Sequence, residues 1–215
     1  MKRKLAIYLA GSIQKGHEKV DETYWTCEDM DFLRNSLEDL EISFLNPATR
    51  SDDLSDQFSV FGRDMLQVFS SDVVFVDARD RRGLGVGAEM MWAKVNKIPV
   101  VILAPQNSHY NKQQTTLLGV PLENWIHPFV ESLSDKIVED LAEGALWIQQ
   151  MVNNSIEVKG IDYVEAAMCY YKGGQLEKDV PMKELLYSNR ELRERIQSLS
   201  VEQSLERKKL LARSM

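Results

Sequence analysis

SDVVFVDARDRRGLGVGAEMMWAKVNKIPVV, residues 71–101, is the stretch that decides the fold class. It begins with an unbroken apolar run at Val73–Val76 and ends with a second one at Val100–Leu103. Between them lie a glycine-rich segment and a helical segment at about Val86–Asn96. A short β-branched strand, a helix and another such strand make the repeating unit of a parallel sheet, whose strands are apolar because both faces are covered.

The same alternation continues on both sides of this stretch. We expect further strands and helices in the following order: strand Leu5–Ala10, helix from about His17 to Leu40, strand Ile42–Leu45, helix near Val60–Ser70, a last strand at Ile126–Val130 and a closing helix from Leu133 to Val152. This order predicts an α/β fold, a doubly wound parallel sheet of about five strands flanked by helices. The segment Gln106–Leu122 lacks periodicity, and we interpret it as a long active-site loop.

The character of the chain changes after Asn153-Asn154. We predict an α/β domain at residues 1–152 and a helical C-terminal extension at residues 153–215, with one helix near Ile161–Tyr171, a break at Gly173-Gly174 and a charge-rich helix from Met182 to Met215. Leucines 185, 192 and 199 lie seven apart, but the second heptad position is mostly polar. A solvated helix that packs on its own domain or on a second subunit is therefore favoured over a coiled coil.

The composition excludes several classes of function. With 215 residues and 44% apolar composition the chain can bury a core, and its 33 acidic against 26 basic residues give no field that would attract nucleic acid or a membrane surface. There is no apolar stretch long enough to span a bilayer, and the first apolar run is too short for a signal peptide, so we expect a cytoplasmic protein. The cysteines and histidines lack ligand spacing, so we expect no metal.

Unusual residues follow the first strand, at an edge where a doubly wound sheet binds ligands. Tyr8 precedes the strand end, and Gly11 and Ser12 follow it. A glycine lets the backbone approach a ligand closely, and a serine hydroxyl can donate to a phosphate or a hydroxyl. An ordinary strand-to-helix turn with a helix cap would have the same residues.

Glu89 follows the third strand after three closely spaced glycines, Gly83, Gly85 and Gly87. We expect the glycines to form a tight loop that delivers Glu89 into the first turn of the next helix, where the helix dipole favours an ionised carboxylate. A charge held there is a candidate nucleophile or general base. A glutamate that only complements the dipole would fit the pattern as well.

A dinucleotide fingerprint is the rival interpretation of the same glycines, because Gly83-x-Gly85-x-x-Ala88 fits its degenerate form. The fingerprint requires an acidic residue about 20 positions later, at the end of the next strand. That strand ends instead at Leu103-Ala104-Pro105. We therefore expect no cofactor.

Several blocks in this order resemble the nucleoside 2-deoxyribosyltransferase-like superfamily: YLAGSI (8–13), GRDMLQVFSSDVVFVDA (62–78), GLGVGAE (83–89) and IPVVIL (98–103). The GSI and GLGVG runs are most similar to the 2′-deoxynucleoside 5′-phosphate N-hydrolase branch. The resemblance extends from Leu5 to Leu103, about half of the chain. It implies that Glu89 attacks C1′ of the sugar, that Tyr8 steadies this carboxylate and that Asp64 contacts or protonates the leaving base.

The resemblance also implies a substrate-binding set: Gly11, Ser12, Asp80, Arg82, Gly83, Gly85 and Gly87. Gly83 stands where the hydrolase branch has a phosphate-binding serine. Either Arg81 or Arg82 replaces that serine, or Asp80 binds the sugar as in the transferases, or these charges form a solvated turn.

The sequence thus predicts an enzyme that cleaves the N-glycosidic bond of a (deoxy)nucleoside or nucleoside 5′-monophosphate, by hydrolysis or base exchange. Its partner would be that small molecule, and the resemblance implies a homodimer or larger homo-oligomer. Two other functions stay open, a non-catalytic nucleotide-sensing module and an NAD-cleaving glycohydrolase.

Overall fold

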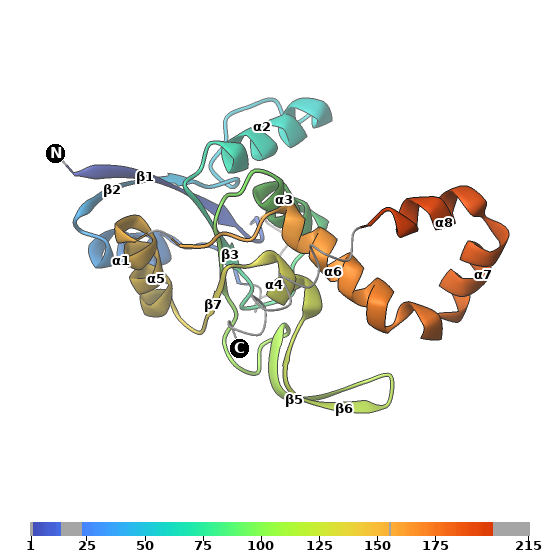
Figure 1. The fold of residues 1–215 in the computed structure, drawn as a ribbon. Helices are drawn as coiled ribbons and strands as arrows, with labels where there is room; N and C mark the ends of the chain where they lie inside the picture. The colour runs from blue at the N-terminus through green and yellow to red at the C-terminus, as the bar shows by residue number, and fades with distance from the viewer. Residues whose placement is uncertain (1, 14–22, 155, 200–215) are drawn as a thin grey trace. The chain divides into compact units, whose positions relative to one another are not determined.

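The computed structural model describes residues 2–13, 23–154 and 156–199 (Figure 1). Contacts divide the chain into two compact units, Met1–Lys159 and Gly160–Met215. The first unit contains the main sheet, and the second contains the C-terminal helices. In these described ranges, no helix combines the length and the apolar character that a membrane span requires.

A five-stranded parallel sheet forms the centre of the first unit, which confirms the predicted fold class. Its strands are β1 (Arg3–Ala10), β2 (Leu40–Leu45), β3 (Val73–Asp77), β4 (Val100–Leu103) and β7 (Lys136–Val138), in the spatial order β2-β1-β3-β4-β7. Every residue of β3 and β4 is buried, which explains why both strands are apolar apart from Asp77 at the end of β3.

Helices cover both faces of the sheet (Figure 1). They are α1 (Cys27–Ser36) and α5 (Leu141–Asn153) on one face, and α2 (Gln57–Phe69), α3 (Leu84–Val95) and α4 (Pro128–Leu133) on the other. Leu33 of α1 and Ile148 of α5 share one core with Phe75 of β3. On the opposite face, the indole N–H of Trp92 in α3 donates to the Met65 carbonyl of α2 at 3.1 Å.

The expected active-site loop contains a β-hairpin instead. β5 (Asn111–Leu117) pairs antiparallel with β6 (Val120–Ile126), and the turn between them uses positive φ angles of 49° at Leu118 and 83° at Gly119. Most side chains of both strands are exposed or half-buried. The hairpin therefore lacks the alternation of apolar and polar residues that predicts a strand.

The predicted last strand at Ile126–Val130 is wrong. Ile126 ends β6, α4 begins at Pro128, and the fifth strand of the sheet is β7, inside the segment that we expected to be helical. β7 has three residues and pairs with β4 at the sheet edge, so it is too short to produce a periodic pattern. The closing helix α5 begins only after Asp140, whose side chain accepts from the Glu143 N–H at 2.9 Å.

Capping residues set helix bounds that differ from the predicted ones. Thr26 and Asp29 form a capping box, so α1 begins at Cys27, ends at Ser36 and leaves Leu40 to β2. Residues 17–22 of the predicted helix lie outside the described residues. Asp56 caps α2, and α3 begins at Leu84, two residues before the predicted start.

The second unit is a series of short helices, α6 (Ile161–Gly174), the 3-10 turn η1 (Leu176–Lys178), α7 (Val180–Ser188) and α8 (Arg190–Gln197). The prediction of one helix from Met182 onward is wrong, because the Asn189 side chain caps a new helix by accepting from the Leu192 N–H at 2.9 Å. The three leucines seven residues apart therefore do not share a helix. Residues 200–215 lie outside the described part.

Gly144 of α5 gives a direct test of this packing. A Cβ at Gly144 would lie 2.4 Å from Cζ of Phe75, whose fully buried ring also packs against Trp25 with ring centroids 5.1 Å apart. We expect Gly144→Ala to lower the free energy of unfolding by about 1–3 kcal/mol, because overpacking outweighs the better helix propensity of alanine.

Urea denaturation of Gly144→Ala beside Gly62→Ala measures this effect. A Cβ at Gly62 in α2 meets nothing within 4 Å, so this matched substitution should instead stabilise the fold by about 0.5–1 kcal/mol. Equal stabilisation by both substitutions would contradict the packing of α5 on Phe75.

Candidate active site

The strand order reverses direction between β1 and β3, which makes their carboxyl ends the expected ligand-binding edge of the sheet. The chain leaves β1 toward β2 on one side and leaves β3 toward β4 on the other, and ligands of doubly wound sheets bind where the order reverses in this way. Gly11 and Ser12 follow β1 at this point, and Ala78 follows β3. Four of the residues expected at the site, Tyr8, Gly11, Ser12 and Arg82, lie on or beside these two strand ends.

Tyr8 and Glu89 form a buried pair between the sheet and α3. The Tyr8 hydroxyl donates to Oε1 of Glu89 at 2.8 Å. Tyr8 is fully buried and Glu89 is only 8% exposed. The second carboxylate oxygen, Oε2, is also buried and has no hydrogen-bond partner among the described residues. Because buried polar atoms are almost always paired, this oxygen requires a partner that the described residues do not provide.

Burial controls the protonation of this pair. It raises the pKa of Glu89 to about 7, with the charge of Asp64 as a further cause, while the hydrogen bond from Tyr8 acts in the opposite direction. Burial, followed by the charge of Glu89, also raises the pKa of Tyr8, so Tyr8 stays a hydrogen-bond donor. Glu89 is therefore about half ionised near pH 7.

The expectation that the helix dipole holds Glu89 ionised in a first turn is wrong. The helix begins at Leu84, which leaves no acidic residue in its first turn and places Glu89 in the second. The dipole acts mainly within the first turn, so desolvation dominates at Glu89.

The expected tight glycine loop is also not formed. Gly83 is the N-cap of α3 with a φ of −83°, and Gly85 and Gly87 lie within the helix. A Cβ at Gly83 or Gly87 would meet nothing within 4 Å, and one at Gly85 would lie 3.9 Å from Oε1 of Glu89. Because they lack side chains, Gly83 and Gly87 leave open space beside α3. None of the three glycines forms a tight turn.

Asp64 lies on α2 within an ion-pair network. Its carboxylate lies 3.1 Å from Nη1 of Arg63 and 3.8 Å from Nη1 of Arg50. Arg50 also binds Asp52 at 2.5 Å, and all four side chains are at least three-quarters buried. Since the charge of Asp64 affects the pKa of both Tyr8 and Glu89, the structure brings Asp64 into the surroundings of the pair.

Sequence reasoning missed the two arginines of this network. Hydrogen bonding to Asp52 is the main cause that raises the pKa of Arg50, so Arg50 is a permanent cation near the pair. The signal available in the sequence was the cluster of charges between the second strand and the following helix.

Arg82 ties the loops after β1 and β3 together. Its side chain is 3% exposed, and its guanidinium lies 2.8 Å from Oδ2 of Asp77 and donates to the Ser12 hydroxyl at 3.1 Å. Burial alone would raise the pKa of Asp77, but the hydrogen bonds and charges of Arg79 and Arg82 outweigh it and lower this pKa. The positive charge of Arg82 is thus matched inside the protein.

Gly11 permits the close approach of these loops. A Cβ at this position would lie 3.3 Å from the Trp25 indole and 3.4 Å from Cβ of Asp77. Ser12 borders a cavity of about 340 Å³ that Tyr24, Asn46 and Ala48 also line. Asp80 is half-buried, and its carboxylate accepts from the Arg81 N–H at 2.7 Å.

Comparisons with known proteins support the fold. No protein-family model and no curated protein matches the chain. A conserved protein from Enterococcus faecalis V583 is similar in structure, with a TM-score of 0.51 and 17% identity over 70% of this chain and 99% of its own. The CMP N-glycosidase BcmB of Clostridium botulinum has a TM-score of 0.38 and 14% identity over 67% of this chain and 98% of its own. BlsM has a TM-score of 0.38 and 16% identity over 71% and 96% of the two chains. The similarity to the Enterococcus protein shows that the fold of this chain is shared with another solved protein.

The raised pKa of Glu89 makes stability depend on pH. Since the folded-state value of about 7 exceeds the ordinary value of 4.5, the folded protein binds more protons than the unfolded chain between these values and loses stability as the pH rises through them. The amide of Glu89→Gln still accepts from Tyr8 but never ionises. We expect this variant to gain up to about 3 kcal/mol over the wild type between about pH 5 and about pH 8.5.

Denaturant unfolding at both pH values, with Glu38→Gln as the control at an exposed glutamate, checks this difference. A stability gap between wild type and Glu89→Gln that stays constant with pH would show that Glu89 is not desolvated.

Proposed function

We propose that this chain cleaves the N-glycosidic bond of a nucleoside or nucleotide, with Glu89 as the nucleophile. The observation that carries the proposal is the buried Glu89 carboxylate, which has one oxygen bound by Tyr8 and the other without a partner among the described residues. The resemblance to the nucleoside 2-deoxyribosyltransferase-like superfamily supports the substrate class.

The geometry suits attack on an anomeric carbon. In the first step, an oxygen of ionised Glu89 bonds to C1′ while the C1′–N bond breaks and its electron pair leaves with the base, which takes up a proton from Asp64 or from water. Water or a second base then attacks C1′ and releases the Glu89 carboxylate. Tyr8 donates to Oε1 throughout, so it stabilises the carboxylate as a nucleophile and as a leaving group.

The network around Asp64 suits contact with the leaving base. Arg50 and Arg63 hold the Asp64 carboxylate on α2, at the side of the pair where α2 and α3 meet. From there Asp64 would contact the polar edge of the leaving base, either by accepting hydrogen bonds from its N–H groups or, when protonated, by donating a proton to it.

Removal of the nucleophile is the first test. We expect Glu89→Ala to lose about 100-fold or more in turnover while the fold is retained. Chromatography of deoxynucleosides, ribonucleosides, their 5′-monophosphates and NAD after incubation with each protein identifies the substrate and measures the loss. Glu38→Ala serves as the control at an exposed glutamate.

Unchanged base release by Glu89→Ala would refute the assignment. Tight binding of a nucleotide without any base release by the wild type would instead favour a sensing module.

The hydrogen bond from Tyr8 gives a second test through pH. Glu89 must be ionised to attack, so we expect kcat/KM to rise with pH through an apparent pKa of about 7. Because the hydrogen bond lowers this pKa, Tyr8→Phe should move the acidic limb to higher pH and reduce the rate at pH 7. Initial rates across the pH range, measured for both proteins, give the shift.

A limb that stays in place or moves to lower pH in Tyr8→Phe would mean that Tyr8 does not stabilise the charged nucleophile.

A further inference from the structure

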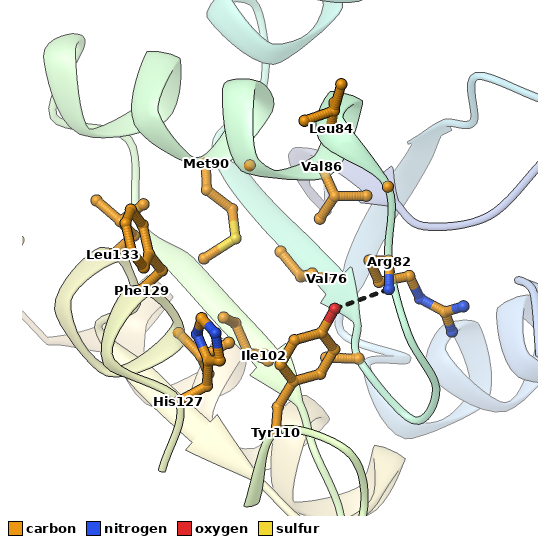
Figure 2. A pocket seen from close by; sticks show the side chains of 14 residues that line it. Val76, Arg82, Leu84, Val86, Met90, Ile102, Tyr110, His127, Phe129 and Leu133 are labelled. Carbon is orange, nitrogen blue, oxygen red and sulfur yellow. Dashed lines mark hydrogen bonds between the residues drawn. The ribbon is translucent and has the colours of Figure 1, made fainter. Parts of the chain in front are cut away.

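A second, largely apolar cavity lies beside α3, at the carboxyl ends of β3 and β4 (Figure 2). Val76 and Ile102 of the sheet line it, and Val86 and Met90 point from α3 toward the rings of Tyr110 and His127. Glu89 is not among its lining residues. The cavity therefore belongs to a different side of α3 from the Tyr8–Glu89 pair.

The cavity is large enough for a small molecule. Its volume is about 400 Å³, within the range of roughly 300–1,000 Å³ that ligand pockets occupy. An apolar cavity of about 150 Å³ already accommodates benzene. The space therefore fits a bicyclic ring system.

Two polar atoms on its wall have unused hydrogen-bonding capacity. Nδ1 of His127 is buried and has no partner among the described residues. The Tyr110 hydroxyl oxygen accepts from the backbone N–H of Arg82 at 2.7 Å, and in the described part of the chain its own proton has no acceptor (Figure 2). A buried polar atom left unpaired costs about 1–3 kcal/mol, so a ligand that pairs these atoms gains affinity.

The rings that carry these atoms are held in place. Tyr110 packs edge-on against His127 with centroids 5.5 Å apart, and Phe129 lies 5.9 Å from His127 on the other side. The backbone N–H of His127 also donates to the Tyr110 carbonyl at 2.8 Å. Ordered aromatic walls favour an aromatic ligand over an aliphatic one of the same size.

The charge at the cavity mouth disfavours a cation. Gly83, the N-cap of α3, lines the cavity and offers no side-chain cap, so the N–H groups of the first turn carry the positive end of the helix dipole. A ring with acceptor atoms suits this mouth better than a positively charged one.

From these observations we propose that the cavity binds a neutral, flat heteroaromatic molecule of one or two rings, whose apolar faces contact the core and whose ring-edge nitrogens pair with His127 and Tyr110. The cavity shares Arg82, Gly83 and Gly87 with the residues expected to bind the substrate, but Glu89 does not line it, so the two sites are distinguished by variants of Glu89.

Benzimidazole and indane form a matched pair of probes, since both are bicyclic and only the first has ring nitrogens. Titration into the full-length chain, followed by NMR, should show benzimidazole binding at least about fivefold more tightly than indane, the ratio expected for one net hydrogen bond. His127→Phe should weaken benzimidazole about fivefold and leave indane unchanged, because one hydrogen bond to the ring nitrogens is lost.

Gly87→Leu should abolish binding of both probes. Gly87 lines the cavity, and a Cβ there meets nothing within 4 Å, so the leucine side chain can occupy the space while the helix gains propensity. Glu89→Gln should bind benzimidazole as the wild type does, which separates this site from the proposed glycosidase site.

Equal benzimidazole affinity in wild type and Gly87→Leu would overturn the proposal, as would loss of binding in Glu89→Gln. No uptake of benzimidazole by the wild type, together with a dimer that Gly87→Leu dissociates in sedimentation, would assign the cavity to a second copy of the chain and also overturn it.

Discussion

The parallel pairing of β1 with β3 determines which side chains meet in this protein. In this register Tyr8 lies opposite Val74 and Ala10 lies opposite Val76. The pairing aligns the ends of the two strands, so the loops that follow them meet above the sheet. It also directs Tyr8 to the face covered by α3, where Glu89 accepts its hydrogen bond across 81 residues of sequence. The position of the carboxylate is thus a consequence of sheet topology.

The sequence predicts the central part of this arrangement well. Val73–Val76 of β3 and all of β4 are continuous apolar runs because both of their faces are covered, and such runs are visible without any structural information. The glutamate after the glycine-rich segment also stands out. Its spatial relation to Tyr8, by contrast, came from the family resemblance and not from the residue pattern.

Burial is the property that the sequence did not reveal. The same Glu89 that we expected to be ionised by a helix terminus has a raised pKa, because it is buried and the helix begins earlier than its apolar pattern indicates. Arg82, one candidate for contact with a phosphate, is paired with the buried Asp77. A charged residue looks the same in a sequence whether it faces solvent or a buried partner, and only the fold distinguishes the two.

The β5–β6 hairpin is structurally separate from the main sheet, and only the residues at its base contribute to the cavity. Its strands pair only with each other, so the main sheet does not depend on them for hydrogen bonds. Tyr110 and His127, which flank the hairpin, nevertheless form a wall of the apolar cavity. Evolution can therefore lengthen, shorten or resurface this excursion between β4 and β7 without disturbing the domain, and two flanking positions are enough to redefine what the neighbouring cavity accepts.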